Sequence, residues 1–285
     1  MEAHKLITER NIQAALLKDK GPEAHLTSFE ILDFTSKGDG YTCFVTSVKV
    51  QFSLKNQDST TSYIFKLNPC RSEDMNEVLE ILFAKETYFY NVILPKLNER
   101  LQAANQAPLR FPKIFYSSAE FGKEVIILED MRLRNFKMVD KKFSLDAAHA
   151  KLVIQEAARL HSASLLLQEH EQLESLHDKY EFLKNLFLKS ECPFFHKAFE
   201  GVFVSCVNTT ATILSYFDKY DKVAKVLRDS APRAFEIMAT VGDGAAKPFQ
   251  TLIHGDCWTN NLLFRFVMHI SSREFQLSFL SISFI

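Results

Sequence analysis

The alternation of hydrophobic and polar residues divides the chain into a strand-rich first part and a mainly helical second part. Residues 5–19 have apolar positions at helical spacing, and from about Ile31 the pattern changes to short strands separated by turn residues. After residue 131 helical spacing returns and continues to residue 239. This pattern predicts an α+β fold in which a small β-rich region precedes a set of helices.

The β-rich region contains three clear strand patterns and one helix pattern. The strand patterns cover residues 43–50, 61–67 and 124–128, the last with the apolar run VIIL. Between the second and third strands, Ser72 and two acidic residues after it provide an N-cap and an acidic first turn for a helix. We expect Pro95 to end this helix, because proline lacks the N–H that a helix interior needs.

Composition and charge narrow the class of protein. The chain has 285 residues, of which 47% are hydrophobic and 24% charged, as in ordinary globular proteins, and its net charge is -1. There is no basic excess for nucleic acid or for an anionic membrane surface, so small molecules are the expected partners. The charged start and the lack of any run near ~18 apolar residues argue against a signal peptide or membrane span and predict a cytoplasmic location. The five scattered cysteines predict free thiols.

The strongest chemical signal is the stretch HGDCWTNN at residues 254–261. Asp256 is followed five places later by Asn261 and then by an apolar run, which is the pattern of a phosphoryl-transfer loop. In such a loop the Asp accepts or orients the proton of the attacking hydroxyl, and the Asn binds a Mg²⁺ that bridges nucleotide phosphates. A polar turn between two strands, 251–253 and 262–264, would have the same letters, so the context upstream decides.

A glycine turn lies upstream of the first strong strand pattern. Gly38 and Gly40 allow positive φ angles and a close approach of the backbone to a ligand, and the strand at residues 43–50 follows them directly. A strand, glycine turn and strand can cover nucleotide phosphates. An ordinary hairpin turn is the commoner origin of such a pair of glycines.

Lys66 and Glu86 are candidates for a buried ion pair. Strand alternation places Tyr63, Phe65 and Leu67 on one face and Lys66 on the other, where its head could also lie in water. Glu86 falls inside the apolar stripe of the predicted helix, and an unpaired buried charge costs several kcal/mol. Lys66 is the nearest candidate partner in chain order, as in the lysine–glutamate pair of kinases. The alternative is that Glu86 lies at the edge of the stripe and reaches solvent.

The apolar strand at residues 124–128 ends in Glu129, Asp130 and Met131. This transition is typical of a hinge between two lobes, whose backbone could meet the edge of an adenine, although a plain exit from a strand would look the same. Further along, His161 lies near the apolar face of a predicted helix. We interpret it as a packed histidine rather than a ligand.

Four strings in this order resemble one family. FAKETYFYNVILPKL, VIILEDM, AARLHSAS and LIHGDCWTNNLLF are similar to the insect ecdysteroid-kinase-like (CHK kinase-like) family, in the choline/aminoglycoside phosphotransferase branch of the protein-kinase-like fold. The resemblance covers residues from about 25 to 264. It implies a nucleotide-binding lobe in 25–131 and a helical lobe with the catalytic loop in 132–264, which leaves an N-terminal helix predicted from the residue pattern in 1–24 and an atypical tail in 265–285.

The resemblance also implies an activity. It points to ATP-dependent phosphorylation of a hydroxyl on a small molecule, with ecdysteroid-type steroid alcohols first and choline-like alcohols second, and with ATP and Mg²⁺ as cofactors. The roles that it implies are catalytic base for Asp256, metal ligand for Asn261, phosphate positioning for Lys66 and Glu86, phosphate cover for Gly38 and Gly40, and adenine hinge for Glu129, Asp130 and Met131.

The chain departs from this family after Phe264. The family continues into an Ile-Asp-Phe-Gln motif, whose Asp is the principal Mg²⁺ ligand, and then into further helices. Residues 265–285 contain no aspartate, and the closest match is Glu274 followed by Phe275 and Gln276. Glutamate can bind Mg²⁺, but this ion tolerates little departure from octahedral geometry. The sequence therefore predicts a C-terminally truncated chain with impaired catalysis, or alternatively a non-catalytic nucleotide-binding or unstable isoform.

Overall fold

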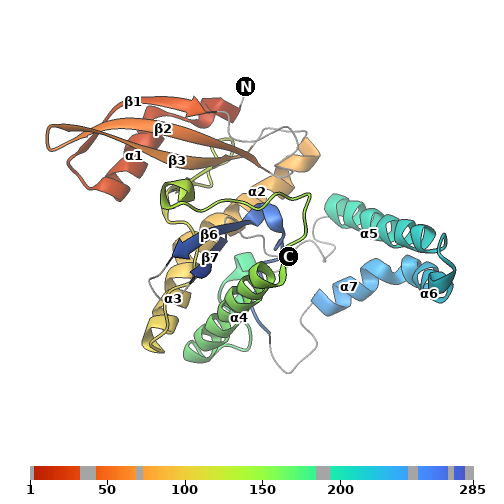
Figure 1. The fold of residues 1–285 in the computed structure, drawn as a ribbon. Coiled ribbons are helices and arrows are strands. Elements are labelled where there is room, and N and C mark those ends of the chain that lie inside the picture. The colour runs from red at the N-terminus through yellow and green to blue at the C-terminus, as the bar shows by residue number, and fades with distance from the viewer. Residues whose placement is uncertain are drawn as a thin grey trace. The chain divides into compact units, whose positions relative to one another are not determined.

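A five-stranded antiparallel sheet and several helices make up the computed structural model of the chain, which describes residues 3–32, 43–68, 73–183, 193–242, 250–268 and 273–279 (Figure 1). The predicted α+β class is confirmed. The described residues within Met1–Glu174 and Leu252–Phe284 form one compact unit, and those within Ser175–Thr251 form a second. The predicted lobe boundary near residue 131 does not coincide with this division and stays a prediction.

The sheet of the first unit has the strand order β1-β2-β3-β5-β4. Its strands are β1 (Ala24–Leu32), β2 (Phe44–Leu54), β3 (Gln57–Leu67), β4 (Ile114–Ser118) and β5 (Val125–Glu129). The three predicted strands are all present, but β2 and β3 are longer than predicted because Lys55 and Asn56, with φ of 52° and 62°, form a tight turn without glycine. The expectation that strands begin near Ile31 was wrong, since β1 begins at Ala24, and β4 was not predicted.

Helix α1 (Glu9–Lys20) covers one face of this sheet (Figure 1). It begins at Thr8, whose side-chain oxygen accepts a hydrogen bond from the backbone N–H of Asn11 at 3.2 Å. The core between α1 and the sheet is apolar: Ile12, Ala15, Leu16, Val48, Val50, Phe65 and Leu67 are fully buried there. This core fixes which face of β3 is turned toward α1, and thereby leaves Lys66 on the opposite face.

The helix after β3 continues past Pro95. It consists of α2 (Glu73–Tyr88), a π-helical turn (Phe89–Ile93) and α3 (Leu94–Ala103), so the expectation that Pro95 ends the helix was wrong. The physical reason is the π turn, which shifts the hydrogen-bond ladder by one residue. Pro95 consequently lies in the first turn of α3, where a missing N–H does no harm.

The rest of the first unit consists of one long helix and a hairpin. Helix α4 (Ala147–His170) begins at Asp146, whose carboxylate accepts from the backbone N–H of His149 at 2.9 Å. The hairpin of β6 (Leu262–Met268) and β7 (Arg273–Phe279) contacts α4 through β7. Lys137 and Phe264 exchange two backbone hydrogen bonds of 2.8 Å, which join this hairpin to the segment that follows β5.

The second unit is helical. Its helices are α5 (Pro193–Leu214), α6 (Asp221–Ser230) and α7 (Ala234–Gly242). Short 3-10 turns over both units cover Ala3–Leu6, Met131–Arg134, Leu176–Asp178, Glu181–Leu183, Asp218–Tyr220, Ala231–Arg233 and Thr259–Asn261. Ala211, Ala224 and Phe235 are buried, whereas Val202, Ile213 and Val226 are exposed. Among the residues that the structure describes, no helix has the length and apolar character that crossing a membrane requires.

Candidate active site

The side chains of Lys66 and Glu86 form a buried ion pair. The Nζ of Lys66, on β3, lies 2.6 Å from Oε1 and 2.5 Å from Oε2 of Glu86, on α2. The two residues are only 5% and 6% exposed. The predicted pairing is thus present in the structure, and the apolar stripe that contains Glu86 was a valid signal for it. Phosphate positioning by this pair stays a prediction.

Electrostatics connect this pair to the catalytic-loop candidate. Burial is the largest single influence and lowers the pKa of Lys66, but the charge and hydrogen bond of Glu86 together with smaller contributions outweigh it, and the pKa is raised above its ordinary value. Cys43 and Asp256 add smaller contributions in the same direction. Lys66 therefore carries a positive charge at neutral pH, to which the negative charge of Asp256 makes the smallest of these contributions.

Tyr90 packs against the same pair. It follows Glu86 by four residues in the π turn and is almost fully buried. Burial, and after it the negative charge of Glu86, raises the pKa of Tyr90 well above its ordinary value. Its hydroxyl therefore stays neutral and adds no charge that would compete with the ion pair.

Apolar side chains surround Lys66 on its face of the sheet. Lys66 pairs with Val45 of β2 and with Ile126 of β5, and Ile64 pairs with Leu128. Directly paired residues share a face of an antiparallel sheet, so these side chains and Lys66 all lie on the side opposite α1. Ile64, Ile126 and Leu128 are buried, so Lys66 lies among packed apolar side chains on this face.

The structure brings Asp256 and Asn261 together. The Nδ2 of Asn261 donates to both the backbone oxygen and Oδ2 of Asp256, each at 2.8 Å. Gly255 has a φ of 77°, which favours glycine, and the N–H of Asp256 donates to Nδ1 of the buried His254 at 3.3 Å. These contacts fix the carboxylate of Asp256 while the residue itself stays exposed.

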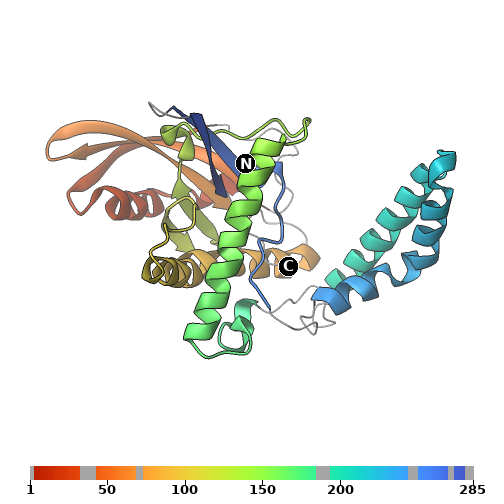
Figure 2. The ribbon, with the colours of Figure 1, turned by 60° about the horizontal axis from the view of Figure 1, so that its bottom comes forward.

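Ser164 forms a hydrogen bond with the segment that leads into this loop. Its Oγ, buried within α4, accepts from the backbone N–H of Leu252 at 3.0 Å and donates to the backbone oxygen of His161 at 2.7 Å. Residues 252–258 run beside α4 (Figure 2). The sequence analysis missed this anchor, although a serine inside the apolar face of a helix was the available signal. His161 is partly buried, as expected of a packed histidine, and burial lowers its pKa.

The predicted hinge lies at the end of β5, and its side chains serve the fold. Glu129 accepts from the backbone N–H of Lys113 at 3.2 Å, and Met131 packs against Phe136 and Leu263. Asp130 is 2% exposed and accepts hydrogen bonds from neighbouring residues, described further below. The adenine role of this segment stays a prediction.

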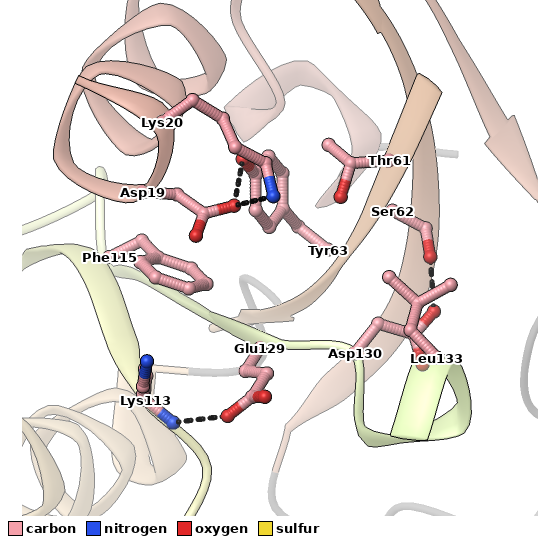
Figure 3. A pocket seen from close by; sticks show the side chains of 10 residues that line it. All are labelled: Asp19, Lys20, Thr61, Ser62, Tyr63, Lys113, Phe115, Glu129, Asp130 and Leu133. Carbon is pink, nitrogen blue, oxygen red and sulfur yellow. Dashed lines mark hydrogen bonds and ion pairs between the residues drawn. The ribbon is translucent and has the colours of Figure 1, made fainter. Parts of the chain in front are cut away.

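A small pocket of about 200 Å³ lies beside the hinge on the α1 side of the sheet (Figure 3). Its wall includes Tyr63, whose hydroxyl donates to Asp19 at 2.9 Å, together with Lys20 and Lys113. Tyr63 points to the face opposite Lys66, because the two are an odd number of residues apart on one strand. This pocket therefore does not contain the Lys66–Glu86 pair or the catalytic-loop candidate.

The amide oxygen of Asn261 is a candidate ligand for Mg²⁺ that arrives with a nucleotide, while its Nδ2 donates to Asp256. Proteins bind this ion through one or two carboxylates together with substrate phosphates, and a carboxylate and an amide meet here at 2.8 Å. Within the described ranges, no group of three or more His, Cys, Asp or Glu side chains is placed to hold a metal. We therefore expect only weak binding of Mg²⁺ without nucleotide.

The backbone of Glu274 lies away from Asn261 along the hairpin. The hairpin register pairs Leu262, the residue after Asn261, with Phe279, and pairs Glu274 with Val267. Glu274 lies five residues from Phe279 along β7, which is about 17 Å at the usual rise of a strand. The letters EFQ do not show this separation, because strand register depends on pairing, and a metal role for Glu274 is untested.

Gly38 and Gly40 lie outside the described residues. Cys43, just after them in the chain, contributes to the raised pKa of Lys66, so the backbone that follows the predicted glycine turn is near the ion pair. Of the predicted site residues, the structure thus brings Lys66 into contact with Glu86 and Asp256 into contact with Asn261.

Comparison with known proteins identifies a family. The model of the ecdysteroid kinase-like family matches residues 37–276, which is most of the chain and includes the ion pair and the catalytic-loop candidate. Neither the curated proteins nor the solved structures give a match. A family match of this extent, over residues that meet in the fold, leads to one conclusion: the chain belongs to the ecdysteroid kinase-like family.

Proposed function

We propose that the chain uses ATP to phosphorylate a hydroxyl group on a small molecule. The observation that carries this proposal is the Lys66–Glu86 ion pair, in which both carboxylate oxygens of Glu86 contact the buried ammonium group of Lys66. In phosphoryl transfer the protein contributes mainly positioning and electrostatic stabilisation. A fixed ammonium beside an exposed, oriented carboxylate supplies both.

Each residue has a definite task in this proposal. Lys66, held by Glu86, binds the phosphate oxygens of ATP, and Asp256 accepts the proton of the attacking hydroxyl. Asn261 orients Asp256 through its Nδ2, and its amide oxygen would hold Mg²⁺. When bound, the magnesium ion neutralises charge on the phosphates.

The proposed acceptors are ecdysteroid-type steroid alcohols first and choline-like alcohols second. Family membership supports this order. We propose a cytoplasmic location, in keeping with the use of ATP.

A second candidate function is nucleotide binding without transfer. The observation that favours it is the register of β6 and β7, which takes Glu274 away from Asn261 and leaves Asp256 as the carboxylate beside that amide. Phosphoryl transfer then lacks a second charged ligand for the metal, whereas Lys66 could still hold phosphates.

The two functions differ in one experiment. ADP release is measured with MgATP and either an ecdysteroid or choline, for the wild-type chain, Asp256→Asn and the control Cys257→Ser, which alters the exposed neighbour. Removing a general base costs about 10²- to 10⁴-fold in rate. We expect Asp256→Asn to lose turnover by this factor with little change in ATP affinity, and Cys257→Ser to keep it. ATP binding without acceptor-dependent ADP release would support the second function and contradict the first.

A further inference from the structure

The side chain of Arg132 turns back from the hinge to the face of the sheet that carries Lys66. Arg132 lies in the 3-10 turn after Asp130, and its Nη2 donates to Oγ of Ser47 at 2.5 Å. Ser47, on β2, pairs directly with Ile64 of β3. Because Ile64 and Lys66 share a face of β3, the guanidinium lies on that same face.

Asp130 holds this guanidinium in a fixed orientation. Its Oδ1 accepts from Nε of Arg132 at 2.8 Å and its Oδ2 accepts from Nη2 at 2.6 Å. Asp130 also accepts from Oγ of Ser62 at 2.5 Å. Burial alone would raise the pKa of Asp130, but the hydrogen bonds from Arg132 and Ser62 outweigh it and hold this pKa below its usual range. The forked pair is therefore charged at neutral pH and formed before any ligand binds.

Arg132 remains partly exposed to solvent, although one edge of its guanidinium group is hydrogen-bonded to Asp130 and Ser47. Its side chain is 46% exposed, whereas Ser47 beneath it is fully buried. Ser47 lies two residues along β2 from Val45, the partner of Lys66, which is about 7 Å along the sheet. A nucleotide whose phosphates meet Lys66 and whose base extends toward the hinge would pass beside this flat cation.

We infer that Arg132 is a base-positioning residue, whose guanidinium plane stacks on the purine of ATP while Asp130 and Ser47 hold its edge. Guanidinium groups stack on aromatic faces, and a fork that is already immobilised loses little side-chain entropy on binding. This inference rests on the proposed function, because it uses the same ATP site. A purely structural ion pair would explain the hydrogen bonds between Arg132 and Asp130. It would not explain why the guanidinium also donates to the buried Ser47 on β2 while the rest of the Arg132 side chain is exposed.

Arg134 provides a matched control. It lies in the same turn, its side chain is 47% exposed, and it pairs with Glu129 at 3.3 Å. Its guanidinium stands over the ring of Phe136, 5.7 Å from the centroid, rather than under the sheet. Replacing Arg134 removes the same charge from the same turn without changing the face that carries Lys66.

Two ligands distinguish base recognition from phosphate recognition. We would measure the affinities of ATP and of inorganic tripolyphosphate, which has no base, by calorimetry with the wild-type chain, Arg132→Ala, Arg132→Lys and Arg134→Ala. Stacking of a cation on an aromatic ring corresponds to about 3- to 30-fold in affinity. We expect Arg132→Ala to weaken ATP by this factor and leave tripolyphosphate unchanged. Arg132→Lys should not restore ATP binding, because an ammonium group has no plane, and Arg134→Ala should resemble the wild type.

Three results with Arg132→Ala would overturn the inference. The affinity for ATP could be unchanged, or both ligands could be weakened equally, which would make Arg132 a phosphate ligand. ATP could also bind more tightly, which would mean that Arg132 obstructs the site. If Arg132→Ala does not fold, Ser47→Ala decides, since it releases one edge of the guanidinium but keeps the pair with Asp130. We then expect ATP to weaken about 2- to 5-fold, the effect of one hydrogen bond. No ATP binding by the wild-type chain would overturn the proposed function as well, whereas normal binding that ignores Arg132 overturns this inference alone.

Discussion

The two faces of the five-stranded sheet are built on different principles. Toward α1 the sheet presents Val48, Val50, Phe65 and Leu67, all fully buried and all apolar. The opposite face buries a lysine and, at its hinge end, an aspartate. Replacing a buried ion pair with well-packed apolar residues is often neutral or stabilising, so the polar face is not the best solution for stability. The comparison teaches that apolar packing alone stabilises one face, whereas the other combines apolar side chains with buried charges, as our proposed nucleotide site would require.

The largest expected effect concerns the apolar face. Phe65→Ala should lower the free energy of unfolding by about 4 kcal/mol, because it removes a fully buried ring and leaves a cavity. Urea denaturation measures this, and the exposed Thr60→Ala on the same strand should change it by less than about 0.5 kcal/mol. Phe65→Ala should leave the ATP affinity of the folded protein unchanged. A loss below about 1 kcal/mol would show that this face does not carry the stability.

The second-largest effect is expected at the Lys66–Glu86 ion pair, where stability and ATP binding can be measured separately. Lys66→Met should destabilise the protein by roughly 3 kcal/mol, because it leaves Glu86 charged and buried without Lys66. The double variant Lys66→Met, Glu86→Leu should recover most of this loss. Thermal melting and ATP titration of both variants form the test. Recovered stability together with recovered ATP binding would contradict a ligand role for the lysine.

A smaller effect is expected at Ser164. Ser164→Ala leaves the backbone N–H of Leu252 without its buried acceptor, which costs about 1–2 kcal/mol. Because the bond fastens the catalytic-loop segment, we expect kcat to fall while KM for ATP stays constant. The exposed Ser162→Ala, two residues away on α4, is the control. A rise in KM with unchanged kcat would mean that Ser164 does not position Asp256.

The smallest effect is a pH dependence at Asp130. Its pKa is depressed in the folded state, so its contribution to stability is present above the unfolded value of about 3.9 and is lost as pH falls through the folded value. Asp130→Asn should be less stable than the wild type by about 1 kcal/mol at pH 7, with the difference shrinking below pH 4. Denaturation over this pH range measures it, with the exposed Asp58→Asn as control. A constant difference from pH 7 to pH 2 would exclude this linkage.

Local patterns in the sequence located the main parts of the candidate site. The apolar stripe around Glu86 required a partner for that carboxylate, and strand alternation left Lys66 on the face away from the core. The spacing of Asp256 and Asn261 likewise placed them on one loop, where they are hydrogen-bonded. In each case the prediction used either the periodicity of apolar residues or the spacing between two residues within a short segment. Such local patterns determine side-chain positions without knowledge of distant contacts.

Features that depend on distant partners were not predictable. The bond between Arg132 and Ser47 joins residues 85 positions apart, and the one between Ser164 and Leu252 joins residues 88 apart. The register that moves Glu274 away from the loop depends on strand pairing. The π turn before Pro95 has no pattern of its own in the letters, since it is set by packing of the helix that contains it.

The central claim is that the nucleotide phosphates meet Lys66 rather than a lysine on the α1 side of the sheet. An ATP analogue with a reactive acyl phosphate transfers its acyl group to a lysine beside the bound phosphates, and peptide mass spectrometry identifies that lysine. We predict labelling of Lys66 that excess ATP suppresses and that is absent from Lys66→Met, Glu86→Leu. Labelling of Lys20 or Lys113, which line the pocket on the other side, with Lys66 unmodified, would contradict the account.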